Sequence, residues 1–373
     1  MHGPYSQIIA IDLGKFNSVV CVYNPADTTH RFQSVATTPR AVHDLLSGLI
    51  RTPGDAAKVL VVFETCEVCG WVHDVATGLG FAVAVANPCH EAWRWTKVKR
   101  KTDRDDALKL ARMAALGQLP TVHVPSPAMR RRRRLVHHRH SLVRRRTRTK
   151  DQVRSIFAQQ GMPLPPRGKA WTKAGVEQLR AESRPLAGCG EQDLWRGRLA
   201  VELALLKSVD EQLAAAEARL DAPGAGDERV RLLTSVPGVG RCLAQTVVCH
   251  LDDVRRFKSA GRVGSYAGLV PKQMESGQVK RSGRITRHGP RLLRGMLVEV
   301  AWMVYRHNAW AKAFVTRVSR GAKGRKKVAI VARARELLVI LWAMLRDNRP
   351  WREPAGGDTP VPVAAAHAPP QPA

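Results

Sequence analysis

The chain has 373 residues, enough for two or three domains, and it carries a formal net charge of +30. Residues 1–97 contain eight acidic and seven basic side chains, so the other 276 residues carry a net charge of +31. A near-neutral segment joined to a strongly basic one predicts a polyanionic partner. No uninterrupted apolar run is long enough to span a bilayer, which favours nucleic acid over a membrane.

Four short apolar runs in the first part of the chain predict β-strands. They are rich in β-branched residues and bounded by turn-forming residues, and they cover residues 8–11, 18–23, 58–63 and 81–86. Helical patterns occupy residues 39–50, 69–79 and 101–116. Because strands alternate with helices, we expect an α/β layered sheet.

Acidic residues stand at the ends of two of these runs. Asp12 follows the first run and Glu64 the third, so neighbouring strands would bring both to one sheet edge. Asp103 and Asp106 share a face at a helix start, whereas Asp105 points elsewhere and is the expected bystander. Clustered carboxylates predict a divalent metal site for Mg²⁺ (or Mn²⁺). Taken singly, each acid could instead be a turn residue or a charge at a helix start.

The seven cysteines form a sparse, odd-numbered set. This argues against a disulfide framework and favours a reducing cytoplasm. Cys66 and Cys69, with Cys89 and His90 downstream, permit a zinc hypothesis. Because the second pair lacks the usual spacing, buried free thiols are the favoured interpretation.

A basic stretch follows prolines at positions 120, 125 and 127. Only one acidic residue, Asp151, occurs between Ser126 and Arg154. A solvated helix face usually carries both signs, so this stretch favours a helix or arm that binds a nucleic-acid backbone. It begins with five consecutive arginines: Arg130, Arg131, Arg132, Arg133 and Arg134.

Residues 191–220 predict a long helix whose leucines suit either a helical hairpin or a coiled-coil partner. Residues 223–226 break that helix, and residues 230–345 are expected to be mostly helical. Beyond Trp351 the chain is rich in proline and alanine, which predicts a disordered tail. We therefore expect domains at 1–125, 126–228 and 229–350, followed by the tail 351–373.

The segment Val236-Pro237-Gly238-Val239-Gly240 predicts a tight connection between two helices. Its glycines, Gly238 and Gly240, would let backbone N–H groups approach a phosphate, as in a helix-hairpin-helix DNA-backbone binder. An ordinary tight helix connection is the alternative.

Ser276 stands beside Gly277 in a basic region and is the candidate nucleophile. A serine hydroxyl needs help from a base, a metal or cations, and nearby basic residues could hold a phosphate. Ser282 is a rival, because it also precedes a glycine, and a flexible loop that only binds backbone remains open. The basic residues are Lys280, Arg281, Arg284 and Arg287.

Taken together, these motifs resemble the insertion-sequence transposases that pair a RuvC-like domain with a C-terminal serine domain. Relatives of this group include the Piv DNA invertase and bridge-RNA-guided recombinases. The matching pieces span nearly the whole chain in order: Ile11-Asp12-Leu13-Gly14-Lys15, Glu64, Asn87-Pro88, Lys101-Thr102-Asp103 with Asp106-Ala107, Val236 to Gly240, Ala267 to Pro271, Ser276-Gly277, and Gly283 to Thr286 with Gly289 and Leu293-Arg294.

The resemblance implies an RNase H-like (RuvC-like) first domain with an acidic tetrad, a helical coiled-coil linker and a mostly helical serine transposase domain. Ser276 would form a covalent link to DNA, and a structured guide RNA would select donor and target DNA. The active form would be a homo-oligomer, a dimer or tetramer, in the bacterial cytoplasm. The implied tetrad is Asp12, Glu64, Asp103 and Asp106.

Two other functions fit the same residues. One is a RuvC-like, metal-dependent, structure-specific endonuclease in which Ser276 only binds DNA. The other is a non-catalytic nucleic-acid-binding protein that keeps the fold.

Overall fold

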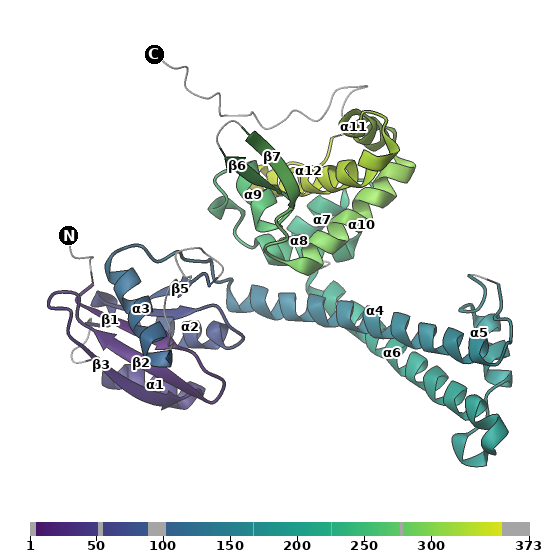
Figure 1. Cartoon of the computed structure of the whole chain (residues 1–373), viewed down its shortest axis with the longest axis horizontal. Helices are drawn as coiled ribbons and strands as arrows, with labels where there is room; N and C mark the ends of the chain where they lie inside the picture. The colour runs from purple at the N-terminus through teal and green to yellow at the C-terminus, as the bar shows by residue number, and fades with distance from the viewer. Residues whose placement is uncertain are drawn as a thin grey trace. The chain divides into compact units, whose positions relative to one another are not determined.

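The computed structural model describes residues 5–50, 55–88, 102–166, 168–224, 226–276 and 279–352. The chain divides into two compact units, Met1–Arg130 and Arg131–Ala373 (Figure 1). The boundary falls in the first turn of α4 (Pro127–Gln159), just after the proline-rich segment. The finer division into three domains and a tail stays a prediction.

A five-stranded sheet forms the centre of the first unit, in the order β3-β2-β1-β4-β5. β1 (Gln7–Asp12), β2 (Asn17–Tyr23) and β3 (His30–Ala36) form an antiparallel meander. β4 (Val59–Glu64) and β5 (Ala82–Ala86) run parallel to β1. This confirms the expected α/β layers, and the strand order is compatible with an RNase H-like fold.

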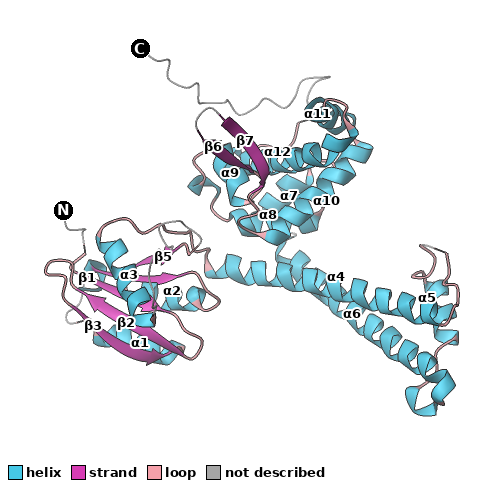
Figure 2. Cartoon of the chain, viewed as in Figure 1, coloured by secondary structure: helices cyan, strands magenta, loops and turns pink. Residues whose placement is uncertain are grey.

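Strand alternation distributes apolar side chains to the two faces of this sheet. Ile9 and Ile11 point toward α1 (Pro39–Gly48) and α2 (Cys69–Gly78), where they are buried in one cluster. Ile8 and Ala10 face α3 (Asp103–Ala115), which covers the opposite side (Figure 2). That second cluster contains Ile8, Ala10, Leu60, Val62, Ala107, Leu110 and Ala111.

β3 was not predicted from the sequence. Its segment His30-Arg31-Phe32-Gln33-Ser34-Val35-Ala36 contains few apolar residues, and none of its side chains is buried. It is a strand because it pairs along its whole length with the buried strand β2, from Asn17 opposite Ala36 to Tyr23 opposite His30.

In the second unit, α4 and α6 (Leu194–Gly224) form an antiparallel helical hairpin. The direction follows from their ion pairs, since Arg139 contacts Glu217 whereas Arg146, one heptad later, contacts Asp210. Near the tip of the hairpin, Leu179 of α5 (Lys173–Ala181) packs in one apolar cluster with residues of α4 and α6. The helical-hairpin interpretation therefore accounts for these buried leucines of α6: Leu199, Leu203 and Leu213.

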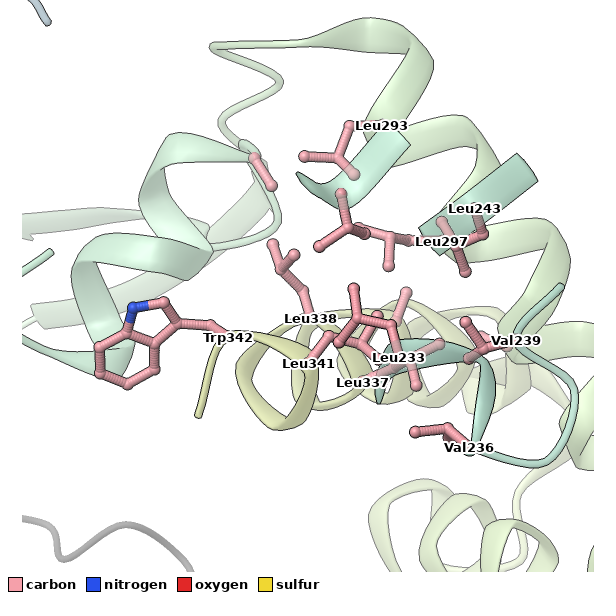
Figure 3. Packing of buried hydrophobic residues seen from close by; sticks show 14 of the residues in the cluster. Leu233, Val236, Val239, Leu243, Leu293, Leu297, Leu337, Leu338, Leu341 and Trp342 are labelled. Atoms are coloured by element: carbon pink, nitrogen blue, oxygen red, sulfur yellow. The ribbon is translucent and has the colours of Figure 1, made fainter. Parts of the chain in front are cut away.

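The remaining helices of the second unit surround α12 (Lys326–Asp347). They are α7 (Glu228–Thr234), α8 (Arg241–Leu251), α9 (Ala260–Tyr266), α10 (Arg291–His307) and α11 (Ala309–Ser319). Figure 3 shows the leucines Leu337, Leu338 and Leu341 of α12 packed among side chains of α7, α8 and α10. No helix in the described part of the chain is long and apolar enough to cross a bilayer.

The body after residue 230 is mostly helical, as expected, and a two-stranded hairpin that was not predicted interrupts it. β6 (Pro271–Ser276) pairs antiparallel with β7 (Val279–Ile285). The segment is polar and has few β-branched residues, so its own pattern was too weak to predict strands.

Candidate functional site

Asp12 and Glu64 lie side by side at one edge of the sheet. β1 and β4 are parallel neighbours with Ile11 opposite Phe63, so the next residue of each strand is one of these two acids. Neighbouring strands lie about 4.8 Å apart, which places the two backbone positions within reach of one ion. Both side chains are partly exposed.

The other two predicted acids lie at the start of α3, which packs on β1, β2 and β4. Asp106 is 9% exposed and stands next to Ala107 and Leu110 of the buried face, whereas Asp103 is exposed. Asp105 belongs to a capping box with Thr102. The Asp105 N–H donates to Thr102 Oγ1 at 3.3 Å, and the Thr102 N–H donates to Asp105 Oδ2 at 3.1 Å.

The carboxylate oxygens of these residues are the ligands that Mg²⁺ prefers. Asp12 and Glu64 stand at the carboxyl ends of neighbouring parallel strands, and α3, which contains Asp106, packs on the same sheet. Within the described ranges, however, no group of three or more His, Cys, Asp or Glu side chains is gathered closely enough to hold a metal. The donor chemistry therefore fits a divalent cation, and the joint role of the four acids stays a prediction.

The cysteine interpretation needs correction. Cys66 is exposed and Cys69 is half-buried, so the pair is not a set of buried thiols. Both follow the end of β4, where the chain turns into α2 rather than into a packed strand. Cys89 and His90, the other half of the zinc hypothesis, lie outside the described residues.

Three of the five consecutive arginines contact protein groups. Arg130 donates to Asp74 and, at 2.6 Å, to the carbonyl of Pro125. Arg132 donates to Asp227 at 2.6 Å, and Arg133 donates to the carbonyl of Cys249 at 2.8 Å. Their guanidinium groups therefore hold the start of α4 in place, which corrects the expectation that the whole run faces nucleic acid.

Arg131 and Arg134 are exposed, and they begin a basic stripe that continues along α4. Its members recur at steps of three, four or seven residues, so they lie on one face of the helix over about 26 Å. No acidic partner is found for them among the residues that the structure describes. We call this set the outer stripe of α4; it comprises Arg131, Arg134, His138, Arg145 and Arg148.

The glycine-rich connection joins α7 to α8 in a tight turn. Gly238 has φ +88°, and a Cβ there would meet Val304 Cγ2 at 2.7 Å. Val236 and Val239 are buried, so the turn is anchored while Pro237, Gly238 and Gly240 remain exposed. Gly240 is the N-cap of α8, which leaves the first N–H groups of that helix directed outward.

Ser276 is the last residue of β6, and its Cα partner is Val279 at the start of β7. Ser282 lies opposite Gln273, farther from the end of the hairpin. The side chains of residues 275–282 lie outside the described part of the structure, so roles for Ser276, Lys280 and Arg281 stay predictions. Arg284 and Arg287 are exposed just beyond.

Two glycines fix the segment that leaves this hairpin. A Cβ at Gly268 would stand 2.1 Å from the His288 carbonyl oxygen, and one at Gly289 would stand 1.9 Å from that of Tyr266. Arg294 adds a hydrogen bond of 2.9 Å to the carbonyl of Ala267. These residues therefore hold the chain on either side of Arg287 against the turn after α9.

Sequence reasoning missed a set of cations that gathers beside the hairpin. Arg317, Lys327, Arg335, Arg349 and Arg352 line one groove together with Arg284 and Arg287. They are scattered over 69 residues of sequence, and only the packing of α11 and α12 near β7 brings them together.

Comparison with known protein families gives two matches. Residues 9–161 match the DEDD-type IS110 transposase family, and residues 230–316 match the family described as "Transposase IS116/IS110/IS902 family". The first match contains Asp12, Glu64, Asp103 and Asp106, and the second contains the glycine turn and Ser276. A DEDD transposase domain implies the use of a divalent metal.

Among curated proteins, a probable family 20 transposase of Pseudomonas aeruginosa is 30% identical over 256 residues, covering 68% of this chain and 74% of the relative. The transposase for insertion sequence element IS1111A of Coxiella burnetii is 26% identical, covering 78% of this chain and 79% of the relative. A pilin gene-inverting protein of Moraxella bovis is 27% identical, covering 72% and 74%.

Proposed function

Because the chain belongs to the IS116/IS110/IS902 family of transposases, we propose that it excises and inserts a mobile DNA element through a covalent link to Ser276. The observation that carries this proposal is the position of Ser276. It ends a strand at the tip of a hairpin whose exit carries the exposed cations Arg284 and Arg287.

In the proposed step, the Ser276 hydroxyl oxygen attacks a DNA phosphorus atom. One O–P bond forms as one P–O bond of the phosphodiester breaks, and the leaving oxygen takes up a proton. The phosphoserine link conserves the energy of the broken bond. A hydroxyl of the new DNA partner then attacks the same phosphorus and releases serine. Arg284 and Arg287 offset the negative charge that develops on the phosphate oxygens.

Asp12, Glu64, Asp103 and Asp106 would hold the divalent ion, which we propose to be Mg²⁺ or Mn²⁺. The ion would supply positive charge beside the phosphate that reacts. The support is the shared sheet edge of Asp12 and Glu64 and the placement of α3 over that sheet. The partial exposure of the two strand-end acids leaves a path for a phosphate.

Donor and target DNA would bind through exposed positive charge. The outer stripe of α4, the turn at Gly238 and Gly240, and Lys280 and Arg281 of the hairpin are the proposed contacts. Arg130, Arg132 and Arg133 are not among them, because each guanidinium group is held by protein oxygens.

Two further parts of the proposal concern partners. The acidic residues and Ser276 lie in different compact units, so two copies of the chain can build one site, which favours a dimer or tetramer. The surplus of positive charge also suits a structured guide RNA in addition to DNA. Both agree with a protein that acts in the bacterial cytoplasm.

A metal-dependent endonuclease is the second candidate, and the DEDD match favours it. In that case the four acids alone would cut DNA with water as the nucleophile, and Ser276 would only bind the backbone. The two functions differ in whether protein becomes attached to DNA.

The test uses a plasmid that carries the coding region with its natural flanks, incubated with the purified full-length chain and Mg²⁺. We expect a DNA adduct that survives denaturation and disappears on protease treatment. Ser276→Ala should abolish the adduct and retain DNA binding, whereas the matched control Ser282→Ala should retain both. Cleavage that persists in Ser276→Ala without any adduct would establish the endonuclease instead.

A further inference from the structure

A groove of about 1150 Å³ runs beside α12 in the second unit. One face of α12 lines it from Lys327 to Asp347, a length of about 30 Å. The floor is apolar and aliphatic. Val331, Val339, Ile340 and Ala343 of this floor are half-buried, whereas Val328 near the start of α12 is exposed.

The rim of the groove is strongly positive. Seven cations line it, from β7, the segment after β7, α11, α12 and the segment after α12. Its two acids already have partners, since Glu336 pairs with Arg333 and Asp347 accepts from Arg346 at 2.7 Å. Among the described residues none of the seven cations forms a salt bridge, although Arg317 and Arg349 lie near enough to Glu336 and Asp347 to act on them electrostatically. The positive charge of the rim therefore favours an extended anionic ligand.

Aromatic rings form part of the wall. Phe314 and Trp351 line the groove, and Trp310 packs behind Trp351 with ring centroids 5.3 Å apart. Arg333 lies 3.6 Å from the Trp310 ring centroid and is 1% exposed. The Trp351 backbone N–H donates to Ser235 Oγ at 3.3 Å, and this hydrogen bond holds the backbone that carries the ring. The Nε1 of Trp351 is buried and has no hydrogen-bond acceptor among the described groups.

We propose that this groove holds a segment of single-stranded DNA, with bases against the apolar floor and aromatic wall and phosphates on the basic rim. The inference rests on the proposed function, because strand exchange exposes single strands beside the cut. Aromatic platforms combined with a basic groove are the usual means of binding unpaired nucleic acid.

The apolar floor is the feature that selects a single strand over a duplex. In a duplex the bases are stacked inside and only their edges face outward, so a duplex gains little from aliphatic side chains. The spread of seven cations over three elements and two irregular segments also fits a regular polyanion better than an acidic peptide with a few carboxylates. The length of α12 suits the 4–16 nucleotides that comparable grooves bind.

The test measures binding of a labelled dT12 strand and of a labelled duplex to the full-length chain by anisotropy. We expect Trp351→Ala to weaken dT12 binding by about 5- to 100-fold and to change duplex binding little. Because Trp351 also packs on Trp310, a second variant is needed. Val328→Glu places a carboxylate on the floor at a residue that is 62% exposed, so the fold should persist. It should weaken dT12 binding by about 10-fold.

The control is Lys207→Ala, an exposed residue of α6 outside the groove that pairs with Glu211 at 3.9 Å, which should not change the preference for dT12 over duplex. The inference is overturned if both groove variants bind dT12 like the wild type. It is also overturned if they lose duplex binding equally, if the same sequence in RNA binds tighter than DNA, or if an acidic peptide displaces dT12 but not duplex.

The adduct assay on the wild type, run beside the dT12 measurements, separates this inference from the proposed function. Groove-dependent dT12 binding that persists while no wild-type adduct ever forms would overturn the serine mechanism alone. A serine adduct in a protein whose groove variants bind dT12 normally would overturn the groove inference alone.

Discussion

Arg132 Nη1 donates a hydrogen bond of 2.6 Å to Asp227 Oδ2, joining the start of α4 to the N-cap of α7. Both side chains are nearly buried, at 9% and 12% exposure. Asp227 also accepts from the backbone N–H and Nε of Arg229, each at 3.0 Å. Burial alone would raise the pKa of Asp227, but the hydrogen bonds from Arg229 and Arg132 outweigh it and lower the pKa to about 2.

We therefore expect Asp227→Ala to lower the free energy of unfolding by about 3 kcal/mol, because it leaves Arg132 buried without its partner. Asp227→Asn keeps an N-cap acceptor and should cost less. Urea denaturation measures both. The control Arg131→Ala removes an exposed neighbour and should stay within about 0.5 kcal/mol of wild type. Equal losses of unfolding free energy in Arg131→Ala and Asp227→Ala would show that the Arg132–Asp227 pair has no special role in stability.

His250 predicts a pH dependence of stability. It is 2% exposed, and neither ring nitrogen has a hydrogen-bond partner among the described groups. Burial, reinforced by the charge of Arg133 and by His137, lowers the pKa of His250 to about 3. The ordinary pKa of histidine is about 6.5, so between these values the unfolded chain binds more protons than the folded chain. Stability must then fall as the pH drops below about 6.5.

From pH 7 to pH 5 this group should cost about 2 kcal/mol of unfolding free energy. Urea midpoints at the two pH values measure it. His250→Phe keeps an aromatic ring beside His137 and cannot take up a proton, so its midpoints should differ much less. A variant with the same pH response as wild type would assign the effect to other groups.

Much of the first unit could be predicted from the sequence because β1, β2 and β4 are buried on both faces. The runs at 8–11 and 58–63 are nearly all apolar, and each ends at an acid, so their pairing placed Asp12 beside Glu64 as expected. β3 and the β6–β7 hairpin were missed because pairing with a neighbouring strand stabilises them, whereas their own side chains are mostly polar.

The arginine run shows where local sequence is insufficient. Arg131 and Arg132 have the same local composition, yet one is exposed and the other contacts Asp227, 95 residues away. Helical periodicity could have separated the two faces of α4, but only the tertiary structure shows which face meets α6, α7 and α8. The groove beside α12 is harder still, since its cations share no periodic pattern.

Asp105 and Asp106 offer a matched test of the acidic site, since they are neighbours with different roles. Asp105 serves the capping box with Thr102, so Asp105→Ala should cost about 1 kcal/mol of stability and leave metal-dependent activity in place. Asp106→Ala should abolish metal-dependent cleavage of the natural element ends. Titration with Mg²⁺ or Mn²⁺ and thermal unfolding give the two measurements. An Asp105→Ala variant that is folded at the assay temperature but inactive would contradict these assignments.

The outer stripe of α4 predicts a specific change in salt response. Each phosphate contact contributes about 0.9 to the slope of log affinity against log salt for duplex DNA. Changing Arg131, Arg134, Arg145 and Arg148 to alanine should lower the magnitude of that slope by about 3 to 4. Fluorescence anisotropy between 50 and 200 mM salt measures it.

The control for this experiment comes from the face of the same helix that meets α6. Arg139 donates to Glu217 at 2.6 Å and Arg146 lies 3.6 Å from Asp210, so both charges are already neutralised within the hairpin. Arg139→Ala with Arg146→Ala should lower the stability of the α4–α6 hairpin and leave the salt slope nearly unchanged. A larger slope change from these inner arginines than from the outer stripe would mean that DNA reaches α4 from the side of α6, with the hairpin opened to admit it.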